Sequence, residues 1–323
     1  MKKLFVILSI CFTIILSGCR SGGGDRINTD GQQTDKGKGY SSNSNTIIVG
    51  VENANYPISF IDEDGEPAGA DIDLIKAIAE DQGLDIEFKP MNFNAIIPSL
   101  QTGQLDAAIS MTSLGPTTAR EKEVDFGDAI TAARTAMISK KGSNLNNIKD
   151  LNDHHIIAVK SGSLAELVAE EVAGETGAEL RRFDTTDKVL QDVENGQSHV
   201  AIESSDVLYS LLWENPNDSI QFLIGDLMGF VFEIMEDRIQ DEGNGFNSVD
   251  IVNAIAVREG DKELLDIVNA GLNNIEENGK IHDIESKWHV VLSTDAWADP
   301  EWNEFKRRVN PNVASGSVSG VNE

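Results

Sequence analysis

The chain has 323 residues, of which 40% are hydrophobic, so it can bury about two domain cores. Its 26 Lys and Arg residues are outnumbered by 54 Asp and Glu residues, which gives a formal net charge of -28. Such an acidic surface excludes nucleic acid and anionic lipid as expected partners. The same acidity also suits solubility or a salty or alkaline medium, so charge alone identifies no ligand.

Residues 1–18 are predicted to be a lipoprotein signal peptide. Lys2 and Lys3 precede an apolar run over 4–16, which is shorter than the ~18 residues or more expected of a membrane-spanning helix. Leu16-Ser17-Gly18-Cys19 resembles the bacterial lipobox, in which the cysteine is acylated and becomes the new N-terminus. We therefore expect export and a lipid anchor on Cys19. The alternative is an ordinary export signal followed by an incidental cysteine.

Residues 19–45 are polar and glycine-rich, which predicts a flexible tether. The folded part of the chain is expected to begin near Thr46. Strand and helix patterns then alternate, and this order is typical of a mainly parallel, doubly wound sheet. The sequence predicts strands at 47–51, 58–60, 86–88 and 107–109, and helices through 72–79 and 96–100.

The same order is then repeated, with strands at 156–159, 180–183 and 200–202 and helices from 163 and over 188–193. Segments 103–110 and 196–203 resemble each other, because each contains the end of a helix followed by a buried strand. This similarity places Ser110 and Glu203 at equivalent strand ends. Open α/β sheets bind ligands beyond the carboxyl ends of their strands, so a ligand between two lobes could touch both residues.

A strand at 255–258 and a long amphipathic helix through 264–275 are expected to return to the first lobe. Two crossings, near 137–142 and 250–254, would form a hinge that allows closure around a solute. The predicted organisation is lobe 1 (first part) over 46–138, lobe 2 over 139–252, lobe 1 return with C-terminal helices over 253–309, and a disordered tail over 310–323.

Arg120 is a candidate for holding a ligand carboxylate, because a planar guanidinium can make two charge-assisted hydrogen bonds to it. The alternative is a surface arginine paired with Glu121 or Glu123. Lys160 to Ser163 lie where a strand turns into a helix, and a helix start presents N–H groups to an anion. Ser163 and Glu166 also form a capping-box pattern, which would explain Ser163 without a ligand.

Glu203 could accept hydrogen bonds from a ligand ammonium, although an exposed loop carboxylate is an equally plain account. Phe93 could stack against an apolar part of a ligand or belong to the core. We find no Ser-His-Asp arrangement with a supporting motif, no phosphate loop and no metal-ligand spacing in the sequence. The sequence therefore implies no cofactor and no metal.

Several motifs occur in the order typical of one known family. From about Ile47 to Trp288 the chain resembles the amino-acid-binding proteins of bacterial ABC importers, the family 3 extracellular solute-binding group. The matching stretches are 55–60, 69–74, 94–100, 103–109, 120–126, 159–163 and 255–261.

The resemblance implies a type II periplasmic-binding-protein-like fold of class α/β, with two lobes that each contain a doubly wound mixed sheet and are joined by hinge crossovers. By the same resemblance Arg120 binds the ligand carboxylate and Glu203 the ammonium. Other positions matched to ligand contacts are Phe93, Glu52, Ser110, Thr112, Lys160 and Ser163.

The implied function is capture of an amino acid or similar polar solute on the outer face of the cell membrane, followed by delivery to an importer's permease and ATPase. We expect a monomer with no catalytic residue. Two rival functions are a dehydratase-like enzyme acting on a small carboxylate and a ligand-sensing receptor module.

The chain departs from the family pattern in three places. The loop between Asp106 and Arg120 is longer than usual, which leaves open whether Ser110, Thr112 or Ser113 faces the ligand. Asn55 stands where an aromatic residue is common, and the stretch over 229–252 is longer than the usual connection. The identity of the solute therefore stays open.

Overall fold

The computed structural model describes residues 45–117, 119–132, 135–214, 219–223 and 252–290, all of which belong to one unit of the chain, Gly37–Glu323. The predicted signal peptide, Cys19, nearly all of the tether and the tail over 310–323 lie outside these ranges. So does the long stretch from 229 up to 251.

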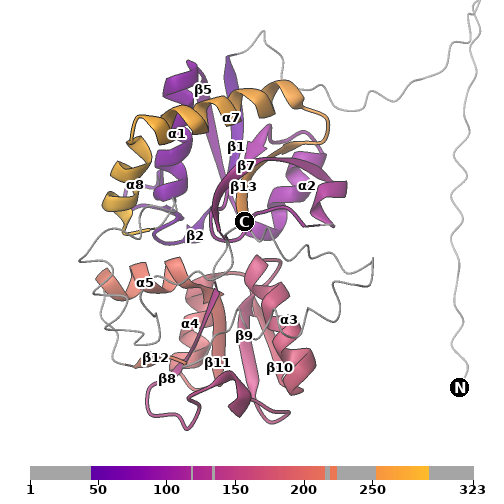
Figure 1. Cartoon of the computed structure of the whole chain (residues 1–323), viewed down its shortest axis with the longest axis vertical. Coiled ribbons are helices and arrows are strands. Elements are labelled where there is room, and N and C mark those ends of the chain that lie inside the picture. Colours follow the sequence, from indigo (N-terminus) through magenta and orange to yellow (C-terminus); the bar gives the residue numbers. More distant parts are fainter. Residues whose placement is uncertain (1–44, 118, 133–134, 215–218, 224–251, 291–323) are drawn as a thin grey trace, which may run out of the picture. The chain divides into compact units, whose positions relative to one another are not determined.

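The first lobe is built on a five-stranded sheet of order β5-β1-β6-β13-β7 (Figure 1). Strand β1 runs parallel to β5 and β6, whereas β13 is antiparallel to β6 and β7. The strands are β1 (Thr46–Glu52), β5 (Asp85–Met91), β6 (Ala107–Ala108), β7 (Val124–Ala132) and β13 (Val252–Arg258). A small antiparallel sheet adds β2 (Ala54–Asn55), β3 (Ser59–Ile61) and β4 (Pro67–Ala68).

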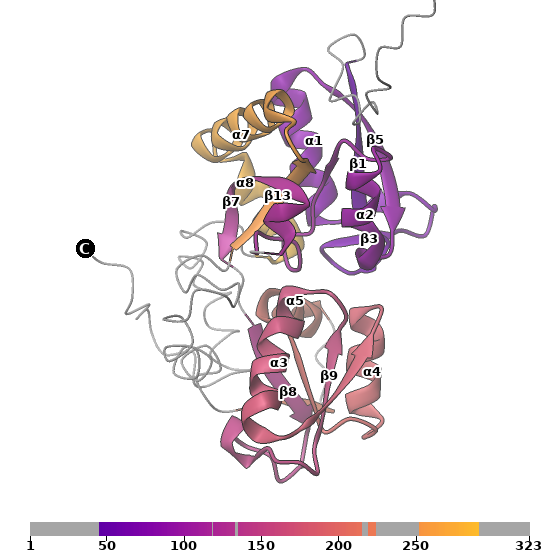
Figure 2. The ribbon, with the colours of Figure 1, turned by 90° about the vertical axis from the view of Figure 1, so that its right-hand side faces the viewer.

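Helices cover both faces of the first sheet. Figure 2 shows α1 (Ala70–Gln82), α7 (Lys262–Glu277) and α8 (Lys280–Trp288) packed together, and they share one apolar core with β1. Helix α2 (Ile96–Gln101), preceded by the short helix η1 (Phe93–Ala95), packs in a second core with Leu105 and Ala256. A third short helix, η2 (Arg120–Lys122), leads into β7.

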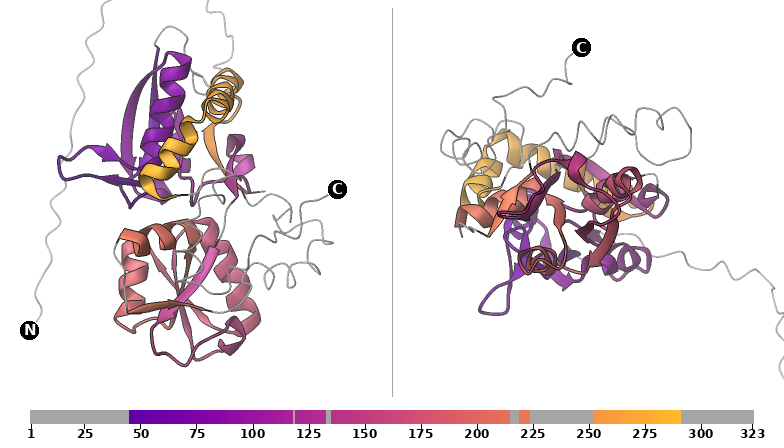
Figure 3. Two further views of the ribbon diagram at one scale, coloured as in Figure 1. Left: turned by 60° about the vertical axis from the view of Figure 1, so that its left-hand side comes forward. Right: turned by 90° about the horizontal axis from the view of Figure 1, so that it is seen from below.

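The second lobe has a five-stranded sheet of order β10-β9-β11-β8-β12. Its strands are β8 (Thr135–Lys140), β9 (Ile156–Lys160), β10 (Glu179–Phe183), β11 (Val200–Ser204) and β12 (Ile220–Phe222). Its helices are η3 (Ile148–Asp150), α3 (Leu164–Thr176), α4 (Thr186–Glu194) and α5 (Ser205–Glu214). One core lies under α3 and another under α4 and α5, so helices lie on both sides of the sheet, as Figure 3 shows.

The two sheets have one topology, in which the first parallel strand lies between the second and third and antiparallel strands follow. In the first lobe β6 pairs with β1 through Ala107 and Val49, and in the second lobe β11 pairs with β9 through Val200 and Ile157. Strands β6 and β11 are the strands of the two similar segments. Ser110 therefore follows β6, and Glu203 lies near the end of the equivalent strand β11. The mixed α/β architecture predicted from the sequence, with two such sheets, is what the described residues form.

The first crossing between the lobes differs from the prediction. Strand β7 ends at Ala132 and β8 begins at Thr135, so the chain enters the second sheet before the expected segment 137–142. The boundary at 138/139 falls inside β8, because Met137 and Ile138 pair with β11. The second crossing, expected near 250–254, reaches β13 at Val252, and the residues before it lie outside the described ranges.

Helix α5 belongs to the second lobe in sequence but also touches the first. Its Val207 is fully buried in the core that holds β1, α1 and α7. Among the described residues, no helix combines the length and apolar character required to cross a membrane.

The close contact of α1 with α7 depends on Gly271, where an added Cβ would lie 2.7 Å from Ile78 Cγ2 and 3.0 Å from Gln82 Cγ. Overpacking a tight core costs about 1–3 kcal/mol, so we predict that Gly271→Val lowers the free energy of unfolding by that amount in urea titrations. Gly174, exposed in α3 with nothing near its Cβ position, is the control. Gly174→Ala should raise stability by about 0.5–1 kcal/mol, and equal stability of both variants would contradict the packing account.

Candidate functional site

Glu52, the last residue of β1, is the centre of a buried polar network. Its Oε1 accepts hydrogen bonds from Ser110 Oγ at 2.5 Å and from Asn55 Nδ2 at 3.1 Å, both in the first lobe. Its two oxygens also accept from Lys160 Nζ at 3.2 and 3.1 Å. Since Lys160 ends β9 of the second lobe, this carboxylate joins the carboxyl ends of the two central strands.

The side chain of Lys160 is fully buried, and that of Glu52 is 4% exposed. Taking two charges out of water costs several kcal/mol per ion, which the mutual attraction and the added hydrogen bonds must offset. The ammonium also lies 5.3 Å from the ring centroid of Phe93, which is a favourable cation–π distance. Removing either charged partner would leave the other buried and uncompensated.

Arg120 begins η2, and its guanidinium donates to three backbone carbonyls: Nη1 to Ser113 O at 3.2 Å and Gly115 O at 2.9 Å, and Nη2 to Gly162 O of the second lobe at 2.6 Å. No carboxylate among the described residues pairs with it. The expected alternative, a pairing with Glu121 or Glu123, is therefore absent there. Burial lowers the pKa of Arg120 to about 10, so the guanidinium stays charged at neutral pH and lacks an anion.

Glu203, near the end of β11, is a carboxylate without a cationic partner among the described residues, whereas Arg120 is a cation without a carboxylate there. Its carboxylate is buried and accepts from Thr186 Oγ1 at 2.9 Å and from Ser204 N at 2.9 Å, and it pairs with no cation among the described residues. The Thr186 hydroxyl also lies 3.4 Å from Asn55 Oδ1 of the first lobe. Glu203 is thus not the exposed loop carboxylate considered above.

Phe93 is 6% exposed and lies between two cations, because its ring centroid is 5.6 Å from Arg120 Cζ as well as near Lys160 Nζ. Gly162 approaches the same place from the second lobe. It has a φ of +76°, which favours glycine, and a Cβ there would collide with the Asn94 amide oxygen. The loop after β9 therefore needs glycine to reach the first lobe.

The capping box predicted at α3 is only half formed. Ser163 Oγ accepts from Glu166 N, as expected of a helix cap, but the Glu166 carboxylate accepts from Gly162 N and not from Ser163 N. Ser161 N is also occupied, because it donates to Phe183 O. The loop therefore presents the Gly162 carbonyl to Arg120, and an anion would have to displace Glu166 to reach the Gly162 N–H.

The three hydroxyl side chains in the loop after β6, those of Ser110, Thr112 and Ser113, differ in their hydrogen bonds. Ser110 donates to Glu52, and Thr112 Oγ1 accepts from Asn55 Nδ2 at 3.1 Å. Ser113 Oγ is buried and has no hydrogen-bond partner among the described residues. Its backbone carbonyl contacts Arg120, so a free hydroxyl lies close in the chain to the unpaired guanidinium.

We call the connected groups at the lobe boundary the interlobe polar cluster, which comprises Glu52, Asn55, Ser110, Thr112, Lys160, Thr186 and Glu203. Five of these seven are residues singled out in the sequence. Arg120 and Phe93 adjoin the cluster through Gly162 and Lys160, whereas Ser163 bonds within its own loop. Sequence reasoning missed Asn55, noted only as a departure, and Thr186, whose one signal was its place at a helix start.

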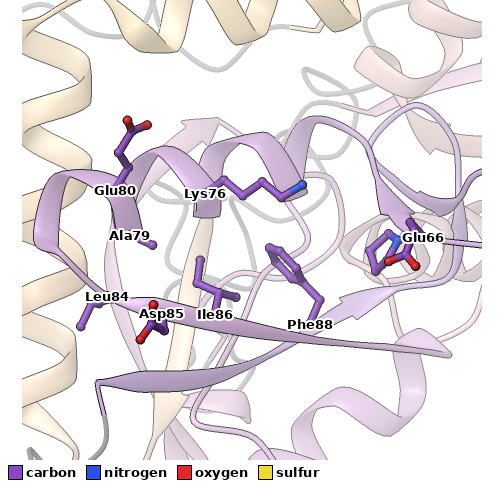
Figure 4. A pocket seen from close by; sticks show the side chains of 9 residues that line it. Glu66, Lys76, Ala79, Glu80, Leu84, Asp85, Ile86 and Phe88 are labelled. Carbon is purple, nitrogen blue, oxygen red and sulfur yellow. The ribbon is translucent and has the colours of Figure 1, made fainter.

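A shallow groove of about 550 Å³ lies elsewhere in the first lobe, between α1 and β5 (Figure 4). It shares no residue with the interlobe polar cluster. Its lining alternates charge and apolar surface, with Lys76 and Glu80 beside Ile86 and Phe88. We assign the candidate site to the cluster and the adjoining Arg120, because Arg120 and Glu203 pair with no opposite charge among the described residues.

A further buried carboxyl, that of Asp71, lies near the cluster. Asp71, fully buried in the first turn of α1, accepts from Met111 N at 3.1 Å through Oδ1, and its Oδ2 has no partner among the described residues. Burial, reinforced by the nearby charge of Glu52, raises the pKa of Asp71 well above its ordinary value of 3.8. The folded chain therefore keeps this proton where the unfolded chain has lost it.

A raised carboxyl pKa makes the folded state lose stability as pH rises from the unfolded value toward the folded one. Asn cannot ionise and keeps the acceptor for Met111 N. We predict that the free energy of unfolding of Asp71→Asn improves relative to wild type as the pH rises above about 4 in urea titrations. Parallel pH profiles for the two proteins would contradict a protonated Asp71.

Comparison with known proteins agrees with this geometry. Residues 47–291 match the family model of bacterial extracellular solute-binding proteins, family 3. The arginine-binding extracellular protein ArtP of Bacillus subtilis (strain 168) is 28% identical over 289 residues, covering 89% of this chain and 98% of ArtP. The glutamine-binding protein GlnH of an ABC transporter in the same organism is 26% identical, covering 89% of this chain and 97% of GlnH.

Among solved structures, an ancestral arginine-binding protein bound to arginine is 31% identical with a TM-score of 0.62, covering 76% of this chain and 98% of the other. The predicted two-lobed fold class is confirmed by this likeness. A family model that matches most of the chain, together with these relatives, settles the assignment. The chain belongs to the bacterial extracellular solute-binding proteins of family 3.

Proposed function

We propose that this chain captures an amino acid between its two lobes outside the cytoplasm and delivers it to an ABC importer. The observation that carries the proposal is a pair of charges on opposite lobes, a half-buried cation and a buried anion, that have no partner of opposite charge among the described residues. Arg120 is a cation with no carboxylate partner, and Glu203 is an anion with no cationic partner, among the described residues. An α-amino acid carries the complementary carboxylate and ammonium groups on one carbon.

Arg120 would hold the ligand carboxylate by exchanging some of its carbonyl contacts for a bidentate, charge-assisted pair. Ser113 Oγ would add a donor, because this buried hydroxyl has no protein partner among the described residues. Glu203 would accept from the ammonium while keeping its bonds from Thr186 and Ser204. Phe93 would close one side with its ring.

The names of the relatives support an amino acid as the ligand, since ArtP is named for arginine and GlnH for glutamine. GlnH is also named as part of an ABC transporter. By analogy the partners of this chain are a membrane permease and an ATPase. The relatives compared here are named for binding, and we propose no catalytic step for this chain.

The proposed location rests on the lipoprotein signal and Cys19. An acylated Cys19 would hold the protein on the outer face of the cell membrane, with the polar residues 19–45 as a tether to the lobes. Electrophoretic mobility and palmitate labelling of the expressed protein, compared with a Cys19→Ser variant, would detect the anchor. We propose that the anchored protein acts as a monomer.

The function is tested by thermal unfolding of the full chain, purified in mild detergent, against each of the twenty common amino acids. A ligand that binds only the folded state raises the midpoint by mass action. We predict a saturable rise with a chemically related subset of amino acids. Absence of a rise with every amino acid would contradict the proposal.

The same assay with Arg120→Ala tests the site. We predict at least about a hundredfold loss of affinity, because a desolvated charge-assisted pair contributes a few kcal/mol. Lys280→Ala, which removes one exposed positive charge from α8, should bind like wild type. Retained affinity in a folded Arg120→Ala protein would move the ligand carboxylate elsewhere.

A further inference from the structure

The interlobe polar cluster and its neighbours contain four ionised side chains of balanced charge. Arg120 and Lys160 are cations, and Glu52 and Glu203 are anions. Two of them, Lys160 and Glu52, already neutralise each other across the lobes at 3.1 Å. The remaining two, Arg120 and Glu203, are the groups that the proposed function assigns to the ligand's carboxylate and ammonium.

Asp71 does not disturb this balance. Its buried carboxyl has one oxygen with no partner among the described residues, and burial raises its pKa, which favours the uncharged form. A zwitterion with an uncharged side chain would therefore leave the closed site electrically neutral. A ligand with a charged side chain would add one net buried charge.

Glu52 is the group that could otherwise receive a cationic side chain, and its charge is already paired with Lys160. It accepts from Ser110, Asn55 and Lys160 at the same time. A ligand guanidinium or ammonium would have to displace Lys160, which would then be buried without an anion. Breaking a buried pair in this way is strongly unfavourable.

We propose, on the basis of the proposed function, that the Lys160–Glu52 ion pair restricts this protein to amino acids with uncharged side chains. Lys160 occupies the carboxylate that would attract a cationic ligand, and Glu52 neutralises the ammonium that would attract an anionic one. The ligand class thus differs from that of the relatives named for arginine. The pair is the specificity-determining element of the site.

The test is isothermal titration of the full chain in mild detergent with L-glutamine, L-asparagine and L-methionine as neutral probes, L-arginine and L-lysine as cationic probes and L-glutamate as the anionic probe. For wild type we expect the best neutral probe to bind at least about tenfold tighter than any charged one. Lys160→Met frees Glu52, and the affinity ratio should shift about tenfold or more toward the cationic probes.

Glu52→Gln leaves the ammonium of Lys160 uncompensated and should shift the ratio toward L-glutamate. The double variant Glu52→Gln with Lys160→Met restores neutrality without the ion pair, and it should prefer neutral probes again. It also keeps the test decisive if a single variant does not fold. Lys280→Met, on the exposed surface of α8, is the matched control and should keep the wild-type ratios.

Tighter binding of L-arginine or L-lysine by wild type would overturn the inference while leaving amino-acid capture intact. Unchanged ratios in the folded variants would overturn it as well. If no amino acid binds to wild type, the inference falls together with the proposed function. These outcomes separate a wrong ligand class from a wrong function.

Discussion

The buried contact between Glu52 and Lys160 is the constraint on which the arrangement at the lobe boundary depends. Both residues end the first of the three parallel strands in their sheets, and neither charge is stable in a dry environment without the other. The pair therefore sets which strand ends can meet. Once they meet, Asn55 and Thr186 complete hydrogen bonds between the lobes that neither lobe could make alone.

The shared sheet topology explains why these particular residues converge. A parallel strand carries its last side chain to the edge where ligands bind in open α/β sheets. Glu52 and Lys160 end the first parallel strands, while Ser110 and Glu203 lie at the ends of the equivalent third ones. Chemically different residues at equivalent positions bring charges of both signs to the site, which suits a zwitterion better than a simple ion.

Much of the fold could be predicted because Ile72, Ile75 and Ile78 show the helical period and 200–202 is a plain apolar run. Strands β7, β8 and β12 were missed, since antiparallel segments such as Gln221 with its neighbours carry weak local patterns. Arg120, Lys160 and Glu203 were candidates from their residue types and positions, and family resemblance added Glu52 and Thr112. Their partners were not predicted, because the bonds of Lys160 to Glu52 and of Thr186 to Asn55 join segments distant in sequence.

The most direct test is a crystal structure of the protein with its bound amino acid. The account predicts the ligand carboxylate on the guanidinium of Arg120, the ammonium on Glu203, and the Lys160–Glu52 pair intact beside an uncharged side chain. A ligand whose carboxylate lies away from Arg120, or whose charged side chain has displaced Lys160 from Glu52, would contradict it.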